Sequence, residues 1–548
     1  MSLKSQGVPS LPEETARVVR RVFPKGNLYI TIGDQIGVLF EDTDFADMYA
    51  REGKPAIAPY VLAMVSIFQF MEDLSDREAA DAVRARMDWK YALHLPLDDP
   101  GFDFSVLSEF RQRVLAHDKG VLMFERVLQR LEEMQLLRKR GKQRTDSTHV
   151  LGASRRLSRL ELVVETMRVT LEGIARVAPE WLQREVPAEW YQRYHRAWRS
   201  LRFPKKQEDR DALLLRVGED GYALLERVNG PETPEAVQEL AVMDTLRRVW
   251  EQEFMRDEAG VHVREPGQRV SGEAMIVTPH DEEVRRSTHG ALEWHGYRLH
   301  WTETCDEGQP RLITHVAVTP ATTPDVVMLP KIHQALAEQG RVPGIHLVDG
   351  GYVAGHVLAQ AETQYGIDVV GPAPKGTHWQ ARTPGGFTLE HFHVDWEKKQ
   401  ATCPQGHNSV TWSESHNERG YPVVHIGFAK STCDVCPVRS KCTRSRTGGR
   451  RLKVLRTHEY LRQARKRQKT PEFQQMYKQR AGVEGTVSVT VQHHGMRRSR
   501  YVGLKKTQLQ ALFTAMAVNL KQAARWLMGV PPASTRSSPL DCLILQPI

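Results

Sequence analysis

Three acidic residues stand where a carboxylate could do chemistry. Asp146 lies in the stretch KQRTDSTHVLGA and Asp349 in IHLVDGGY, and each is predicted to end a short strand. Glu484 is predicted to share one helix face with Tyr477 and Arg480, because the three are spaced at i, i+3 and i+7. A carboxylate at a strand end needs a cation or hydrogen-bond donors, because burying it without a partner is costly.

Together the three carboxylates predict an oxygen-ligand cage for Mg²⁺ or Mn²⁺. Two such ions roughly 4 Å apart can clamp the attacking and leaving oxygens of an in-line phosphoryl displacement. No G-x-x-x-x-G-K-[ST], G-x-S-x-G or H-E-x-x-H motif in the sequence indicates a different reaction. Taken singly, each acid has an ordinary structural explanation, since Asp-Gly after a strand is a common turn. The order and context of all three favour catalysis.

The chain has an excess of positive charge that is unevenly distributed. Lys and Arg number 76 against 67 Asp and Glu, a formal net charge of +9. Residues 439–469 contain thirteen Lys or Arg and a single acidic residue, Glu459. Two smaller clusters are Arg138 to Arg140 with Lys142 and Arg144, and Arg497, Arg498, Arg500, Lys505 and Lys506. Such clusters indicate a polyanionic partner, most often nucleic acid; the alternative is a solvated helix face.

Four of the six cysteines fall in one short region. Cys433 and Cys436 have the C-x-x-C spacing of a zinc knuckle, with Cys442 and Cys403 as further ligands and His407 as an alternate. The spacing matches no named zinc finger. The sequence therefore leaves two readings open, a structural Zn²⁺ site and reduced cysteines packed in a β-rich segment.

The hydrophobic pattern predicts an all-α N-terminal domain over residues 1–140. Pro59 is predicted to start one helix, and Ser75 with Glu78 has the spacing of a capping box that starts another. No apolar run is long enough to cross a bilayer, and the N-terminus lacks the apolar core of a signal peptide. We therefore expect a cytoplasmic, nucleoid-associated protein with no membrane partner.

Residues 141–528 are predicted to form an α/β domain with a mixed sheet and flanking helices. Two insertions interrupt it, a helical one over about 155–265 and a β-rich one with the cysteines over about 376–460. The remaining tail, 529–548, is rich in Pro and Ser and is predicted to be loose. The individual elements predicted in the domain are a hairpin of Tyr297–Asp306 with Leu312–Thr322, helices at Leu329–Gln339 and Val357–Tyr365, strands at GIHLVDGGY and Ile367–Pro374, and a helix capped by Thr470 and Pro471.

Three blocks of this sequence resemble the DDE transposases of bacterial insertion sequences, most closely the insertion-sequence eleven-eighty-two type. The blocks are TDSTHV, then HGALEWHGYRLHWTETCDEGQPRLITHVAVTPAT with HLVDGGY, and last YKQRAGVEGTVSVTVQHHGMRRSRYVGLKKTQLQALFTAMAVNL. The resemblance covers roughly residues 30–530. It implies an RNase H-like catalytic domain and a helical N-terminal domain of the DNA-binding kind.

The resemblance also implies roles for particular residues. Asp146, Asp349 and Glu484 match the metal-binding triad, for which two Mg²⁺ or Mn²⁺ ions are expected. Tyr477 and Arg480 match the first two positions of the Y-(2)-R-(3)-E-(6)-K signature of many such enzymes. The lysine of that signature falls at Val491 and is missing. Residues that could supply its phosphate contact are Arg497, Arg498 and Lys505, and Arg500 belongs to the same DNA-binding candidates.

The resemblance predicts a transposase that binds terminal inverted repeats, pairs two ends as a homodimer on double-stranded DNA, and cleaves and joins strands. A related metal-dependent nuclease without strand transfer is the first alternative. A DNA-binding protein with a decayed site is the second, and the missing lysine leaves room for it. His149 could contact DNA or lie beside the metal ligands; an ordinary strand histidine is the simpler interpretation.

Overall fold

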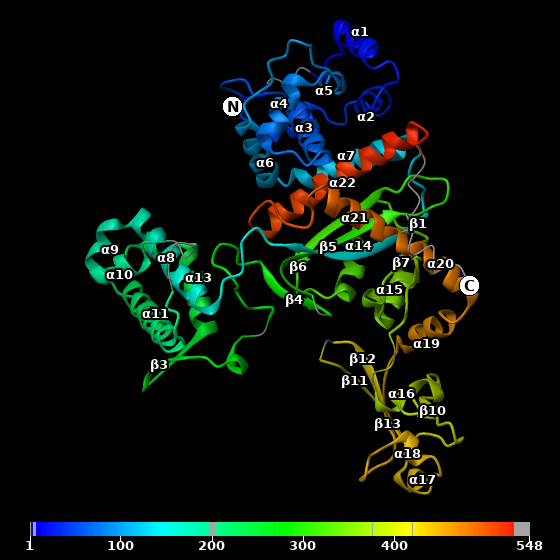
Figure 1. Cartoon of the computed structure of the whole chain (residues 1–548). Coiled ribbons are helices and arrows are strands. Elements are labelled where there is room, and N and C mark those ends of the chain that lie inside the picture. The colour runs from blue at the N-terminus through cyan, green and yellow to red at the C-terminus, as the bar shows by residue number, and fades with distance from the viewer. Residues whose placement is uncertain are drawn as a thin grey trace, which may run out of the picture.

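The computed structural model describes residues 2–3, 7–196, 203–270, 272–290, 292–374, 376, 378–418 and 420–530. The chain is a mixed α/β protein, as predicted, with helices at the top, a helical lobe to one side and a small lobe with short strands at the bottom of Figure 1. The predicted loose tail from residue 531 onward, with Cys542, lies outside the described residues. Within the described ranges, no helix is long and apolar enough to cross a membrane.

A six-stranded mixed sheet forms the centre of the molecule. Strand β5 pairs antiparallel with β1, β6 and β4, whereas β7 runs parallel to β1 and β8, giving the order β6–β5–β1–β7–β8 with β4 beside the start of β5. The predicted hairpin is confirmed as β5 and β6. The strands are β1 (Lys142–Leu151), β4 (Arg285–His289), β5 (Leu292–Thr304), β6 (Ile313–Pro320), β7 (Ile345–Val348) and β8 (Asp368–Val370).

Helices cover both faces of this sheet. On one face, the long helix α22 packs against β6 and also against the N-terminal helices, so Trp301 of β5 and Phe513 of α22 belong to the same hydrophobic core. This face also carries α20 (Pro471–Lys478) and α21 (Gly482–His493), and α22 spans Leu504–Leu527. On the other face lie α14 (Asp325–Glu338), α15 (Gly355–Tyr365) and α19 (His458–Arg467), which pack around Val348.

The N-terminal region is helical, as predicted. Pro59 starts α3, and the capping box is confirmed, because the Ser75 N–H donates to Glu78 Oε2 at 2.8 Å and the Glu78 N–H donates to Ser75 Oγ at 3.3 Å. Phe70 stacks on Phe513, which joins these helices to α22. The helices are α1 (Glu13–Val22), α2 (Leu28–Thr31), α3 (Pro59–Met71), α4 (Asp76–Ala85), α5 (Met87–Ala92), α6 (Ser105–Ala116) and α7 (Lys119–Glu133), with short π and 3₁₀ turns at η1 (Ile32–Ile36) and η2 (Asp42–Met48).

The segment between β1 and β4 has its own hydrophobic core, built around Val163, Trp250 and Phe254. Most of it is helical, but its end forms a hairpin of β2 (Phe254–Asp257) and β3 (Gly260–Val263) where only helix was predicted. Asp257 accepts the Ala259 N–H at 2.9 Å, and this tight turn reverses the chain. The helices are α8 (Arg159–Val177), α9 (Pro179–Glu185), α10 (Ala188–Tyr194), α11 (Gln207–Val228), α12 (Glu235–Gln238) and α13 (Ala241–Glu253).

The lobe with the cysteines, which we call the cysteine lobe (residues 376–460), contains short strands, as predicted, and also short helices. Strands β11, β12 and β13 form an antiparallel sheet, and β9 pairs with β10. The strands are β9 (His393–Asp395), β10 (Gln400–Thr402), β11 (Thr411–His416), β12 (Pro422–Gly427) and β13 (Arg451–Leu455), and the helices are α16 (Trp379–Arg382), α17 (Lys430–Asp434) and α18 (Arg439–Cys442).

Several predicted boundaries differ from the observed ones, and two of these differences have a local cause. Helix α14 begins at Asp325, four residues before the predicted start, because Pro324 caps it and an acidic residue in the first turn suits the helix dipole. Strand β8 ends at Val370 instead of Pro374, because Gly371 and Pro372 follow and proline cannot donate to a strand ladder.

Candidate active site

The register of β1 and β7 brings the first two acids together. Thr145 of β1 lies opposite Val348, the last residue of β7, in the parallel ladder. One residue further along, Asp146 and Asp349 are therefore neighbours on the same face of the sheet. Across β5, Asp146 is opposite Trp301, which fixes that face as the one covered by α20, α21 and α22.

Asp146 was predicted to end its strand, but it lies in the middle of β1. The strand continues to Leu151 because β5 keeps pairing with it after β7 has ended. What ends at this point is β7, so the β1–β7 pairing stops one residue before Asp146. Its own Oδ1 accepts the backbone N–H of Ser147 at 2.9 Å.

Asp349 does follow the end of its strand, as predicted. It caps the 3₁₀ turn η5 (Gly350–Tyr352), with its Oδ1 accepting the Gly351 N–H at 2.9 Å. Neither of the two glycines that follow has a positive φ. Both positions are crowded: a Cβ at Gly350 would lie 3.1 Å from the Pro372 carbonyl oxygen, and one at Gly351 would lie 3.1 Å from Asp325 Oδ2.

Glu484, Arg480 and Tyr477 do not share one unbroken helix. Tyr477 belongs to α20, Arg480 to the 3₁₀ turn η7 (Gln479–Ala481), and Glu484 to the first turn of α21. The contacts nevertheless link this segment to the sheet. Arg480 pairs with Asp146 at 2.9 Å and with Glu484 at 3.1 Å, so its guanidinium lies between a strand acid and the helix acid.

The charges of this group act on one another. Burial raises the pKa of Asp146 above its ordinary value, and the charge of Asp349 raises it further, whereas Arg480 and the Ser147 N–H oppose the shift. Burial also raises the pKa of Tyr477, and the charges of all three carboxylates raise it further. The Glu484 side chain is 65% exposed against 15% for Asp146, so the third acid is open to solvent and the first is not.

A buried ion pair that was not predicted from the sequence lies beneath the site. Arg144 of β1 and Glu303 of β5 are directly opposite in the ladder, with their side chains 4% and 0% exposed, and Arg144 Nε donates to Glu303 Oε1 at 2.6 Å. Arg144 also donates to the Gln479 carbonyl, and Thr486 Oγ1 donates to Glu303 Oε2, both at 2.5 Å. The pair therefore fastens the segment that carries Glu484 to the sheet.

Glycine at position 482 is required by this arrangement. A Cβ there would lie 2.1 Å from a guanidinium nitrogen of Arg144, so the close approach of helix and arginine depends on the missing side chain. Arg144 had been grouped with cations that face a polyanion, and that interpretation is wrong for this residue, because its charge is buried and paired.

A second polar network lies under the strand acids on the opposite face. Thr145 Oγ1 is 2.7 Å from both Thr302 Oγ1 and His346 Nε2, and His346 Nδ1 is 2.9 Å from His333 Nε2. Burial lowers the pKa of His333 to about 4 and holds that of His346 well below its ordinary value, so both rings are neutral at pH 7. The network ties β1 to β7 one residue before Asp146.

The donor types of the acidic group fit a divalent cation, since all three are carboxylates and the charge of Asp349 raises the pKa of Asp146. Arg480 supplies the positive charge in this structure. In the described part of the chain, no three His, Cys, Asp or Glu side chains lie close enough together to hold a metal ion as they stand. Metal binding would therefore require Arg480 to release the carboxylates and the exposed Glu484 to turn inward.

Two family models match this sequence. The model described as "Transposase DDE domain" matches residues 402–524, and the one described as "Transposase domain (DUF772)" matches residues 17–113. Both matches support a DDE transposase of bacterial insertion sequences. The matches do not single out one insertion-sequence type. No curated protein and no solved structure matches the sequence.

The two matched segments meet in the structure. The first comprises α1 to α6, and the second runs from the cysteine lobe through Glu484 to α22, which packs on α3 and α6. Asp146 and Asp349 lie outside both matches, and it is the sheet that brings them beside Glu484.

The basic residues predicted to bind DNA have different surroundings. Arg497 donates to the Nε2 of His149 at 2.7 Å and to its carbonyl at 2.9 Å, which ties it to the far half of β1. Arg500 pairs with Asp73 and lies over the ring of Phe70, so it holds the N-terminal helices. The exposed members of the group are Arg498, Lys505 and Lys506.

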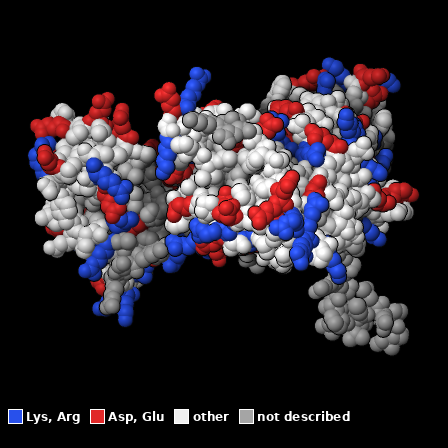
Figure 2. Space-filling model, turned by 90° about the horizontal axis from the view of Figure 1, so that it is seen from above, with Lys and Arg blue, Asp and Glu red and all other residues white. Residues whose placement is uncertain are grey.

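His149 therefore has structural partners, in line with its simpler interpretation. Its ring lies 5.5 Å from that of Trp294, and burial lowers its pKa. The long basic run is also partly neutralised: Arg465 pairs with Glu390 at 2.5 Å, and Arg467 pairs with Asp368 at 2.5 Å. On the face drawn in Figure 2, basic and acidic side chains are intermixed, with no continuous basic patch.

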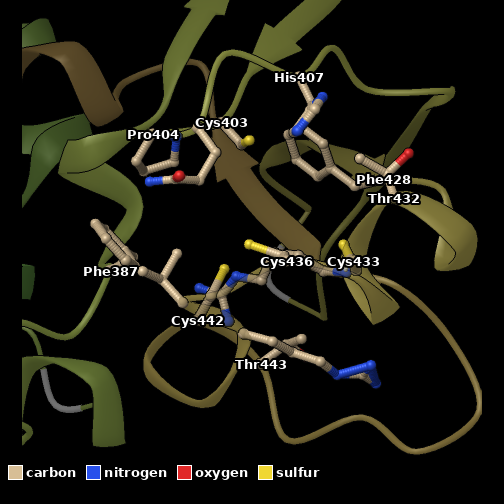
Figure 3. Close-up of a pocket in the computed structure, with 14 residues that line it drawn as sticks. Phe387, Cys403, Pro404, His407, Phe428, Thr432, Cys433, Cys436, Cys442 and Thr443 are labelled. Atoms are coloured by element: carbon tan, nitrogen blue, oxygen red, sulfur yellow. Dashed lines mark hydrogen bonds between the residues drawn. The ribbon is translucent and has the colours of Figure 1, made fainter.

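The four clustered cysteines, Cys403, Cys433, Cys436 and Cys442, line one pocket in the cysteine lobe, with His407 at its edge (Figure 3). This pocket is far from the acidic group, because the cysteine lobe lies below the central sheet in Figure 1. The two predicted metal sites are thus separate structures.

Proposed function

We propose that this transposase binds the terminal inverted repeats of its insertion sequence and catalyses metal-dependent cleavage and strand transfer of DNA with Asp146, Asp349 and Glu484. The observation that carries the proposal is the β1–β7 register, which makes the two strand acids neighbours on the face that α21 covers. The contact of Arg480 with Asp146 and Glu484 supports the third member. We assign the sheet to the RNase H-like kind on its order, three antiparallel strands followed by two parallel ones.

The chain's own residues divide the work. Magnesium or manganese ions, when bound by the three carboxylates, supply the charge that activates the attacking hydroxyl and neutralises the phosphate. Asp146 and Asp349 provide a fixed pair of oxygen donors, because backbone pairing holds their strands. Arg480 keeps these charges balanced before DNA arrives and is then free to contact a phosphate. Tyr477 is protonated near neutral pH, and burial raises its pKa further, so its hydroxyl can donate a hydrogen bond.

DNA contacts are proposed for Tyr477 and Arg480 beside the acids and for Arg497, Arg498, Arg500 and Lys505 beyond them. Arg498 and Lys505 are exposed and stand in for the lysine that Val491 replaces. Arg500 serves mainly to hold the N-terminal helices against the segment that precedes α22. Pairing two transposon ends for strand transfer implies a homodimer assembled on DNA.

The test uses duplex oligonucleotides that carry the inverted repeats flanking the gene, a target plasmid and Mg²⁺. Wild-type protein should cut the repeat ends and join them to the plasmid. Asp349→Ala should bind the same duplex but lower cutting by about 10⁴-fold, roughly 5 kcal/mol of transition-state stabilisation. Asp368→Asn is the matched control, because Asp368 begins the next parallel strand and pairs with Arg467 away from the acids.

Equal cutting by wild type and Asp349→Ala would overturn the assignment of the acids. Cutting without joining would show a nuclease. Binding without cutting by wild type, in both Mg²⁺ and Mn²⁺, would show a DNA-binding protein with a decayed site, the alternative that Val491 leaves open.

A further inference from the structure

The cysteine lobe gathers four thiols from different local elements of its chain. Cys403 follows β10, Cys433 lies in α17, Cys436 follows that helix and Cys442 ends α18. All four line the same pocket, as Figure 3 shows. All four are free thiols in the described structure, with no disulfide between them, so they can act as metal ligands.

The backbone around the thiols is arranged in tight turns. The Cys403 N–H donates to the His407 carbonyl at 2.8 Å, the Gly406 N–H donates to the Cys403 carbonyl at 2.9 Å, and Gly406 has a φ of 82°. This left-handed position is one that glycine adopts without strain. The Cys436 N–H donates to the Cys433 carbonyl at 3.3 Å, which closes a second turn within the C-x-x-C pair.

One sulfur already accepts a hydrogen bond from the backbone. The Arg450 N–H donates to Cys433 Sγ at 3.4 Å. Hydrogen bonds to ligand atoms orient metal ligands and stabilise their charge. A neutral thiol gains little from such a donor, whereas a thiolate gains much more.

The side chain of Arg450 also favours a negatively charged partner in the pocket. It lines the pocket, lies over the ring of Phe392 at 5.8 Å, and its Nε is buried with no hydrogen-bond partner in the described structure. Arg450 is partly exposed, but its Nε is withdrawn from water without a partner, and an unpaired buried donor of a charged group is costly. Four thiolates around one Zn²⁺ carry a net charge of −2, which would balance this cation.

The lobe has little else to stabilise it. Its core consists of seven buried residues, Phe392, Ala401, Val424, Ile426, Phe428, Leu452 and Val454. A core of this size gives little net stability without a disulfide or a metal. Cys403, Cys433 and Cys442 pack against this core, so a metal held by them would fasten the turns to the β11–β12–β13 sheet.

The geometry points to a structural Zn²⁺ site formed by Cys403, Cys433, Cys436 and Cys442. As the described side chains stand, no three potential ligands are close enough to hold an ion, so binding would draw the four sulfurs inward to about 2.3 Å from the metal. The site is closed, with no position for substrate. It fixes the position of Arg450 and the exposed basic residues of the lobe, and it does not depend on the proposed chemistry of the acids.

The test begins with the full-length protein, purified under reducing conditions without chelator, and measures zinc by elemental analysis. One zinc per chain is expected. The double variant Cys433→Ser, Cys436→Ser should contain less than a tenth of that amount and should be cleaved faster within residues 376–460 by a protease. Replacing zinc with Co²⁺ should give the intense visible absorption of tetrahedral thiolate coordination in the wild type alone.

Two controls define the ligand set. Cys305→Ser removes a thiol outside the lobe, and His407→Ala removes the nearest alternative ligand; both should keep one zinc. Absence of zinc from wild-type protein together with no uptake of Co²⁺ would overturn the site. Retention of zinc by the double cysteine variant, or its loss from His407→Ala, would overturn the assigned ligands.

Discussion

The candidate site is held in two different ways. Asp146 and Asp349 belong to neighbouring strands, so the backbone ladder of β1 and β7 sets their spacing. Glu484 belongs to a helix that touches the sheet through side chains, chiefly Arg144 with Glu303 and Arg480 with Asp146. The comparison shows that the strand acids need only their strands to be placed correctly, whereas the third acid depends on individual side-chain contacts.

The buried ion pair of Arg144 and Glu303 provides the strongest test of this difference. Glu303→Leu leaves the guanidinium of Arg144 buried without its partner and should lower the free energy of unfolding by about 3–5 kcal/mol. Chemical denaturation measures the change. The double variant Arg144→Met, Glu303→Leu should recover most of the lost stability, because an apolar pair replaces the charges. If the single variant is as stable as the wild type, the pair does not fasten α21 to the sheet.

The two glycines that flank Glu484 offer a finer test. Gly482→Ala places a Cβ 2.1 Å from the held guanidinium of Arg144, so it should lower stability by about 1–3 kcal/mol through overpacking. Gly485→Ala is the matched control, since no atom lies within 4 Å of the new Cβ, and its better helix propensity should make it neutral or slightly stabilising. Thermal unfolding compares them. Equal effects at the two positions would contradict close packing at Gly482.

Arg480 can be examined through metal affinity, on the assumption that the acids bind metal. Arg480→Ala removes a positive charge beside Asp146 and Glu484 and should tighten Mn²⁺ binding by about tenfold, roughly 1.4 kcal/mol. Electron paramagnetic resonance of free Mn²⁺ measures the affinity. Arg467→Ala, which frees Asp368 on β8, should leave it unchanged. Weaker Mn²⁺ binding by Arg480→Ala would mean that the arginine does not compete with the metal.

The smallest expected effect per residue concerns the histidines under the strand acids. Burial lowers the pKa of His333 and His315 to about 4 and that of His300 to about 3, and His346 is also shifted down. As the pH falls, these histidines therefore bind protons near pH 6.5 in the unfolded chain but only near pH 4 or below in the folded chain. Stability should be full above pH 6.5 and fall by roughly 1 kcal/mol per histidine at pH 5.5.

Urea unfolding at pH 7.5 and 5.5 measures this loss. The raised pKa of Asp146 acts in the opposite sense, but it is one group against four. His425→Gln, at an exposed position of β12, should leave the pH dependence unchanged. Stability that stays constant between the two pH values would show that these rings are not buried in their neutral form.

Several features of the site could be read from the sequence because they depend on local order. The strand before Asp349, the capping box at Ser75 and the capped helix at Thr470 all follow from neighbouring residues, and the structure confirms them. The buried carboxylate of Glu303 also had a signal that was missed. It continues the alternation of Tyr297, Leu299 and Trp301, so a charge on that buried face required a partner.

The break in the helix before Glu484 had no such signal. Tyr477, Arg480 and Glu484 fit a helical spacing, and the 3₁₀ turn between them arises where Gln479 offers its carbonyl to Arg144 of a distant strand. The basic cluster around Arg144 likewise had the composition of a DNA-binding surface. Only its position opposite Glu303 shows that this arginine serves the interior.

The sequence by itself determined which residues could act: three acids in order, four clustered cysteines and the strands and helices that carry them. Local propensities and hydrophobic periods contain that information, because they depend on residues a few positions apart. The tertiary structure alone decided which of these residues meet. Pairing between Thr145 and Val348 spans some two hundred residues, and no local pattern encodes the register that puts Asp349 beside Asp146.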